Sequence, residues 1–296
     1  MRLGLKVLSG ILTIASAAHA GPQTFNSALP VAKGQFIFRE QLLFKKASDD
    51  PSIQNRNLNV IGSVSVLAYG ITSDLAVFGV LPYLNKRLDV TTPGRRVTRD
   101  TNGIGDMRLF GRYTAYQKDM PGKSFRIAPF AGVELPTGDD NATDSLGVLP
   151  APLQLGSGSW DPFVGVAITY QTLDYEIDLS ASYKANTAAN GFEFGDQARL
   201  DASLQYRLWP RDLGGGVPGF LYGVLEGNLI YQDQNKIGGI ADVNSGGTTL
   251  YIAPGLQYVT KRWVLEAIVQ LPALQKLNGT ALGDDFIFRS GFRMNF

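Results

Sequence analysis

Charged side chains recur at every second position in several segments of this 296-residue chain. In one such segment, Glu176 and Asp178 alternate with the apolar residues Ile177 and Leu179. A period of two places the charges on one face of a β-strand and the apolar side chains on the other. A face with closely spaced carboxylate and guanidinium groups can form ion pairs, and it can also line a hydrated path for polar solutes.

Extending this alternation along the chain assigns nine cations and eight anions to the polar face. The cations are Arg39, Arg108, Arg112, Arg126, Lys184, Arg199, Arg207, Arg289 and Arg293. The anions are Asp106, Glu134, Asp161, Glu176, Asp178, Asp201, Glu226 and Glu266. These residues either form a structural ion-pair network or line a pore. Because the two signs nearly cancel, the sequence predicts little preference between small cations and small anions.

The residue inventory argues against several kinds of chemistry. The chain has no cysteine and its one histidine is His19, so disulfides, structural zinc sites and histidine-based catalysis lack their residues. Gly214, Gly216 and Gly219 match a dinucleotide-binding pattern, but a strand pattern follows them where a helix is required. Ser157 has no histidine to act as its base. We therefore expect no enzymatic activity, no cofactor and no metal site.

Two predicted loops carry clustered charge. The basic cluster could pair with lipopolysaccharide phosphates or remain solvated, and it consists of Lys86, Arg87, Arg95, Arg96 and Arg99. The acidic cluster offers oxygen ligands for a divalent cation but lacks the glycine of an EF-hand, and it consists of Asp139, Asp140, Asn141 and Asp144.

The first twenty residues have the pattern of an export signal. A basic start and an apolar stretch over residues 7–18 lead to Ala18-His19-Ala20, an A-x-A cleavage pattern. We therefore expect a cleaved signal peptide at 1–20, a periplasmic N-terminal segment at 21–33 and a barrel at 34–296. The whole chain has 27 basic and 26 acidic residues, a balance that does not favour nucleic-acid binding.

Twelve segments alternate apolar and polar residues over about ten to fifteen positions, longer than the five or six typical of strands in soluble sheets. That length suits a tilted strand that crosses a membrane. The sequence predicts an all-β transmembrane, antiparallel, up-and-down β-barrel of about 12 strands, with its apolar face toward lipid and its charged face toward the lumen. The segments are 34–45, 57–70, 75–85, 104–117, 124–136, 159–171, 174–185, 195–209, 219–232, 248–260, 263–275 and 285–296.

The connections and the aromatic residues favour the same architecture. Short connections alternate with longer ones such as 86–103 and 137–158, as periplasmic turns alternate with outer loops in outer-membrane barrels. Tyrosine and tryptophan residues collect near both predicted ends of the strands, where aromatic girdles lie. The chain ends with alternating Phe292, Met294 and Phe296, which resemble the signal that the outer-membrane assembly machinery recognises.

Several short motifs occur in an order that resembles a known family. They are Gly70-Ile71-Thr72-Ser73-Asp74-Leu75 with Leu81-Pro82-Tyr83, Gly103-Ile104-Gly105-Asp106, Glu134-Leu135-Pro136-Thr137-Gly138, Gly156-Ser157-Gly158 with Trp160-Asp161, and Gln270-Leu271-Pro272 with Leu277-Asn278-Gly279. Their order is similar to that of a bacterial outer-membrane transporter family named for the meta-pathway of phenol degradation. The resemblance covers nearly the whole mature chain. It implies a barrel and uptake of small molecules, with no catalytic residues to carry over.

The sequence thus predicts an outer-membrane β-barrel that forms a narrow channel for passive uptake of small solutes, among them aromatic or hydrophobic compounds. The expected partners are outer-membrane lipid, lipopolysaccharide, the assembly machinery and a small-molecule solute. A structural barrel with a plugged lumen is the alternative, because loops such as 137–158 and 233–247 are long enough to fold inward. An outer-membrane enzyme is a weaker alternative because the mature chain lacks histidine.

Overall fold

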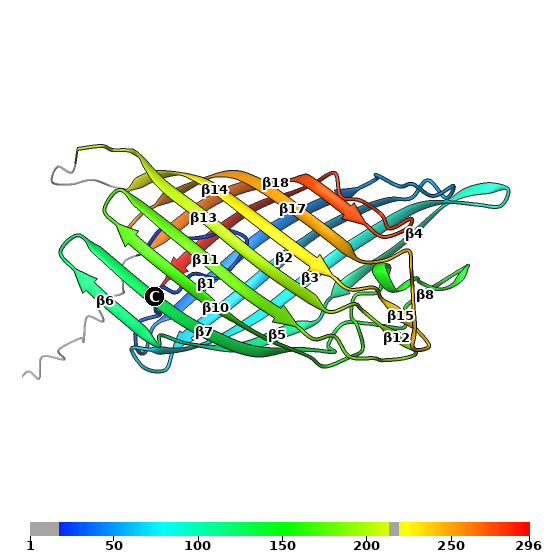
Figure 1. Ribbon diagram of the computed structural model, residues 1–296, viewed down its shortest axis with the longest axis horizontal. Helices are drawn as coiled ribbons and strands as arrows, with labels where there is room; N and C mark the ends of the chain where they lie inside the picture. The colour runs from blue at the N-terminus through cyan, green and yellow to red at the C-terminus, as the bar shows by residue number, and fades with distance from the viewer. Residues whose placement is uncertain (1–17, 213–218) are drawn as a thin grey trace, which may run out of the picture.

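The computed structural model describes residues 18–212 and 219–296, which form a closed barrel of 12 antiparallel strands (Figure 1). The barrel closes because β1, the first strand, pairs with β19, the last. Its strands are β1 (Phe36–Ala47), β2 (Asn57–Gly70), β3 (Leu75–Thr92), β5 (Met107–Tyr113), β7 (Lys123–Leu135), β10 (Asp161–Thr172), β11 (Tyr175–Lys184), β13 (Gln197–Trp209), β14 (Phe220–Gln232), β17 (Gly247–Val259), β18 (Trp263–Leu277) and β19 (Phe286–Asn295). At either end of β5, β4 (Arg95–Ile104) pairs with β3 and β6 (Tyr116–Met120) pairs with β7.

The alternation seen in the sequence corresponds to the two faces of this sheet, so the predicted all-β barrel is confirmed. On β11, Ile177 and Leu179 are 38% and 46% exposed on the outer face, whereas Glu176 and Asp178 are only 2% and 0% exposed. Leu200, adjacent on β13, is 56% exposed. This is the reverse of a soluble protein, which buries leucine and exposes carboxylates. An outer surface of this composition is compatible with lipid.

The prediction of a loop over residues 86–103 was wrong. They form a two-stranded extension in which β3 and β4 remain paired up to Thr92 and Arg95, and it projects beyond the barrel wall (Figure 1). A tight turn closes this hairpin at Gly94, whose φ of +89° suits glycine. Val90 and Val97 face each other across it, and cross-strand β-branched pairs stabilise an extended conformation.

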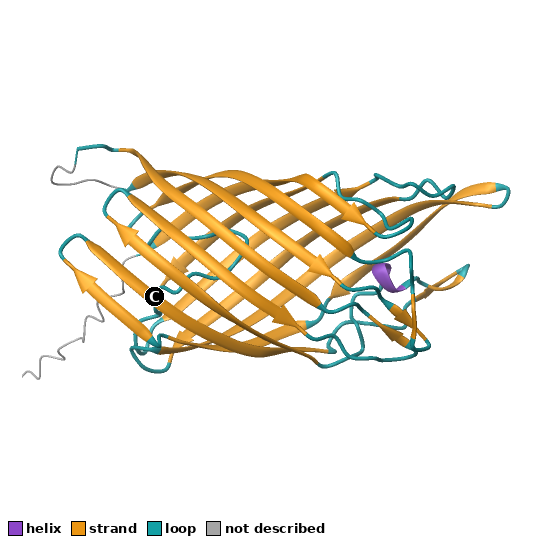
Figure 2. Ribbon diagram, in the orientation of Figure 1, coloured by secondary structure: helices purple, strands orange, loops and turns teal. Residues whose placement is uncertain are grey.

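The short irregular elements gather at the end of the barrel opposite the C-terminus (Figure 2). They are β8 (Thr143–Asp144), β9 (Gly147–Val148), the 3₁₀ turn η1 (Ala151–Leu153), β12 (Phe192–Glu193), β15 (Lys236–Ile237) and β16 (Ile240–Ala241). Because outer-membrane barrels have short periplasmic turns and long outer loops, we take this end as the outer mouth. Among residues 18–212 and 219–296, no helix is long and apolar enough to cross a membrane.

Candidate functional site

The chain before β1 lies inside the barrel. We call residues 21–33, which follow the expected cleavage site, the luminal segment. It begins at Gly21, whose N–H donates to the Gln257 side-chain oxygen on β17 at 3.2 Å. It ends before Gly34, whose N–H donates to the Gly70 carbonyl at 2.8 Å at the periplasmic end of the barrel. We expected residues 21–33 to extend into the periplasm, and the structure instead places them against the inner face of the wall.

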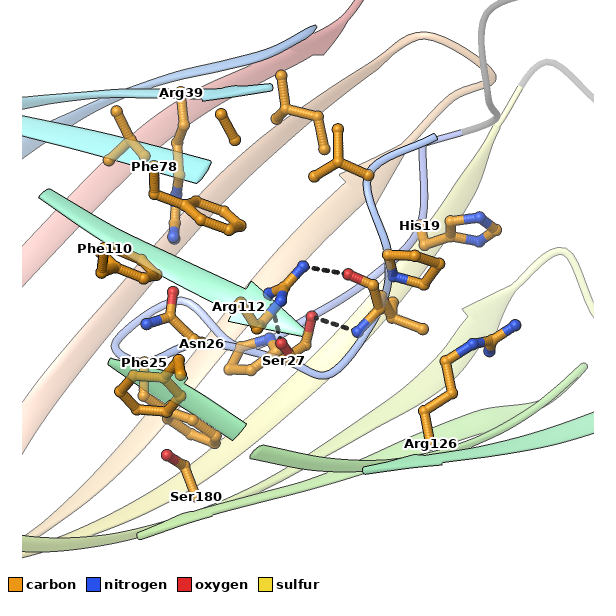
Figure 3. A pocket seen from close by; sticks show the side chains of 18 of the residues that line it. His19, Phe25, Asn26, Ser27, Arg39, Phe78, Phe110, Arg112, Arg126 and Ser180 are labelled. Atoms are coloured by element: carbon orange, nitrogen blue, oxygen red, sulfur yellow. Dashed lines mark hydrogen bonds between the residues drawn. The ribbon is translucent and has the colours of Figure 1, made fainter. Parts of the chain in front are cut away.

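Four of the predicted pore residues hold the luminal segment: Glu226, Arg112, Arg39, whose guanidinium donates to the Gln23 carbonyl at 2.8 Å, and Arg199, whose guanidinium donates to the Thr24 carbonyl at 3.2 Å. The Glu226 carboxylate accepts hydrogen bonds from the backbone N–H groups of Gln23 at 2.6 Å and Thr24 at 3.2 Å. The Arg112 guanidinium donates to the carbonyls of Ser27, at 2.5 Å, and Leu29 (Figure 3). Charge-assisted hydrogen bonds such as these are stronger than neutral ones. The segment is therefore fixed by charged side chains that would otherwise face the solute path.

Small side chains let the segment approach the wall closely. Ala28 is fully buried against Ala128 of β7 and Ala167 of β10, and its N–H donates to the Thr169 hydroxyl at 2.8 Å. Larger side chains at these two wall positions would keep the backbone of the segment away from the sheet. Small side chains on the wall thus make room for the segment, and charged side chains on the wall bind it.

The predicted pore residues also contact one another and their neighbours on the wall. Four ion pairs join inner-face residues across the wall: Arg39–Glu266, Arg108–Glu134, Lys184–Glu134 and Arg199–Asp201. Further contacts are those of Arg207 with Asp174, Arg126 with Asp119, Glu176 with Gln171, Asp178 with Thr169, Asp161 with Ser159, Asp106 with Ser157, Arg289 with Gln270 and Arg293 with the His19 carbonyl. The inner face therefore carries separate small clusters.

A cavity of about 1060 Å³ runs beside the luminal segment, and cations predominate on its walls. Its Lys and Arg residues are Lys33, Arg39, Arg108, Arg112, Arg126, Lys184, Arg199 and Arg293, whereas its acidic residues are Asp74, Asp119 and Asp201. The cause is side-chain length. Carboxylates stay close to the sheet while the longer cations reach past them: the side chain of Arg108 is 53% exposed and that of its partner Glu134 is 8% exposed. A count of charges in the sequence does not reveal this difference.

One wall of the cavity is aromatic. Phe78 and Phe110, on neighbouring strands, stack with ring centroids 4.5 Å apart, and Phe163 meets Phe110 edge-on at 5.9 Å. Phe110 lies directly opposite Gly132 in the register, and an added Cβ at Gly132 would lie 2.3 Å from the Phe110 side chain. The missing side chain at Gly132 therefore gives the Phe110 ring room to cover the next strand.

This wall was not predicted, because only charged residues were assigned to the inner face. The available signal was a phenylalanine at the inward phase of the alternation, as in Arg108, Phe110 and Arg112. The luminal segment also contributes Phe25 to the lining of the cavity (Figure 3). Aromatic side chains at lumen-facing positions thus mark a surface for apolar groups within an otherwise charged cavity.

At the outer mouth, charged residues of the two predicted clusters form contacts between loops. Lys86 donates to the Pro152 carbonyl at 3.2 Å, and Arg99 forms an ion pair with Asp144 at 2.7 Å. Hydrogen bonds from Arg99 lower the pKa of Asp144. Asp140 accepts a hydrogen bond from Asn190. The acidic cluster is therefore engaged with its neighbours, and the described part of the chain holds no group of three His, Cys, Asp or Glu residues placed to bind a metal ion.

A comparison with one solved structure agrees with this architecture. A crystal structure of an outer-membrane channel from Pseudomonas putida F1 is similar, with a TM-score of 0.71 and 14% identity over 94% of this chain and 100% of that one. The NanC porin has a TM-score of 0.49 and 11% identity over 87% of this chain and 98% of that one. The β domain of the Bordetella autotransporter BrkA also has a TM-score of 0.49, with 13% identity over 89% of this chain and 100% of that one. No curated protein matches the sequence.

The closed barrel and its apolar outer band place the protein in the bacterial outer membrane. Residues 52–271 match the family described as the MetA-pathway of phenol degradation. This match covers more than half of the chain and includes most of the motifs on which the resemblance was based. The chain therefore belongs to this phenol-degradation family.

Proposed function

We propose that this barrel is a narrow channel for passive uptake of small solutes across the outer membrane. The observation that carries the proposal is the cavity of about 1060 Å³ beside the luminal segment, lined by charged side chains. Twelve strands give a barrel between the filled eight-stranded and the open sixteen-stranded types, so the path is narrow. The Pseudomonas putida F1 protein with the same fold is itself an outer-membrane channel.

The aromatic wall supports aromatic or hydrophobic compounds as solutes. Phe78, Phe110 and Phe163 line the cavity, where a passing apolar group can contact the parts of their rings that Phe78–Phe110 stacking leaves uncovered. Transport of this kind forms no covalent bond, so the proposal includes no enzymatic activity and no cofactor.

Single-channel recording of the purified, refolded barrel in a planar bilayer tests the proposal. We expect discrete current steps of low conductance in potassium chloride. A barrel that inserts into the bilayer and carries no current would instead support a plugged, structural role. The luminal segment, held by Arg112 and Glu226, is the observation that favours this second function.

We further propose that the C-terminal residues Phe292, Met294 and Phe296 are the signal that the assembly machinery reads. Phe292 and Phe296 are 36% and 52% exposed on the outer surface, where another protein can contact them. Phe296 also exchanges backbone hydrogen bonds with Phe36 at 2.7 and 3.0 Å, next to the seam of the barrel. Lipopolysaccharide is a further proposed partner, through Arg87 and Arg95 on the hairpin that projects from the outer mouth.

Deleting Phe296 should sharply lower the yield of folded barrel in the outer membrane. The variant Phe296→Ala separates the two roles of this residue, because it keeps the backbone hydrogen bonds to Phe36 and removes only the ring. A recognition signal predicts that both variants lose yield and that Phe296→Tyr does not. Heat-modifiable migration of membrane fractions on gels measures the yield. Normal yield for Phe296→Ala would show that the assembly machinery does not recognise the ring.

A further inference from the structure

The aromatic wall and the cations of the cavity meet at one place. Phe110 lies between Arg108 and Arg112 on the inner face of β5. Arg112 also covers the Phe78 ring, with its guanidinium carbon 4.8 Å from the ring centroid. On the neighbouring wall, Phe163 is directly opposite Lys184 in the register of β10 and β11. A ring resting on this wall would therefore have a guanidinium or ammonium group beside it.

The cations beside the rings are not fully neutralised. Arg108 and Lys184 share a single carboxylate, that of Glu134. Asp161 is opposite Glu134 in the register, but it is fully buried and accepts hydrogen bonds from Ser159 and Thr187 at the outer mouth. Along the whole cavity, Lys and Arg outnumber acidic residues. The local charge thus favours an anion.

We propose that this wall binds small aromatic carboxylates, with the ring against Phe110 and Phe163 and the carboxylate at Arg108 and Lys184. The inference rests on the proposed channel function and names its solute class. A guanidinium group matches a carboxylate with two parallel hydrogen bonds, and an ammonium group adds a second positive charge. A neutral aromatic compound gains only the ring contact, and an aliphatic acid gains only the charge contact.

Binding to the purified full-length barrel in detergent, measured by calorimetry, tests the proposal with three probes of similar size. Benzoate carries both features, cyclohexanecarboxylate lacks the aromatic ring and benzyl alcohol lacks the charge. We expect benzoate to bind several-fold more tightly than either of the other two. Equal affinity for benzoate and cyclohexanecarboxylate would overturn the aromatic part of the proposal, and equal affinity for benzoate and benzyl alcohol would overturn the ionic part.

Variants then locate the site. Arg108→Gln should weaken benzoate binding by about tenfold, since hydrogen bonds to charged groups have effects of this size. Phe110→Leu should remove the discrimination between benzoate and cyclohexanecarboxylate. Arg262→Gln is the matched control, because Arg262 lies in the turn between β17 and β18, outside the cavity. Heat-modifiable migration checks that each variant is folded, and Lys184→Gln provides a second test if Arg108→Gln does not fold.

The outcomes of this experiment are separable from those of the channel recordings. Benzoate binding by a barrel that carries no current would support the site while overturning the channel. A barrel that conducts potassium chloride and shows no preference for benzoate would keep the channel and overturn the site. Unchanged benzoate affinity in both Arg108→Gln and Lys184→Gln would place the ligand elsewhere.

Discussion

Deleting residues 22–30 should raise the single-channel conductance of the refolded barrel several-fold. This part of the luminal segment occupies the lumen next to the cavity and is held there by Glu226 and Arg112. Without it, both charged groups would be exposed to water, so the deletion would not leave them buried and unpaired. The barrel wall itself loses no strand, since β1 begins at Phe36. Conductance in potassium chloride measures the result.

A milder variant tests the same point without a deletion. An added Cβ at Gly70 would lie 2.2 Å from the Ala32 carbonyl oxygen, so Gly70→Ala should displace the end of the luminal segment and make the current less stable. Gly111→Ala is the matched control, because an added Cβ there meets nothing within 4 Å. If the deletion leaves the conductance unchanged, the path does not run beside the luminal segment.

The strands could be predicted because membrane burial imposes a simple rule on the sequence. A lipid-facing residue must be apolar, and its two neighbours in the strand face the lumen. The sequence of each strand therefore shows which of its side chains face lipid. The residues from Glu176 to Leu179 show this rule and its outcome in the structure. The hairpin at 86–103 was missed because it extends beyond the membrane, where lipid no longer imposes an apolar outer face.

The contents of the lumen could not be predicted in the same way. The luminal segment has no periodic pattern, because it binds the wall through backbone groups, such as the carbonyls of Ser27 and Leu29, that every residue possesses. The alternation also predicts which face of the sheet a side chain is on, but it does not predict how far that side chain extends into the lumen. Arg108 and Glu134 were both assigned to the lumen, but only Arg108 reaches the cavity. The lumen holds both signs of charge, as expected from the sequence, but the side chains that line its cavity are mainly cationic.

Leu179→Arg should prevent most of the protein from assembling, whereas Ser180→Arg should be tolerated. Leu179 is 46% exposed on the outer surface of β11, and an arginine near the bilayer midplane costs about 2–4 kcal/mol on the lipid face of such barrels. Ser180, the next residue, lines the cavity and is opposite Asp201 in the register, so a guanidinium group there would have a partner and water. The fraction of heat-modifiable barrel in membranes, and the urea concentration at which each purified variant unfolds, measure the difference. Because the two positions are adjacent, local strand propensity and distance from the strand ends are the same for both. Equal loss at both positions would mean that arginine disrupts β11 itself, and equal tolerance would mean that the outer face of this strand does not contact lipid.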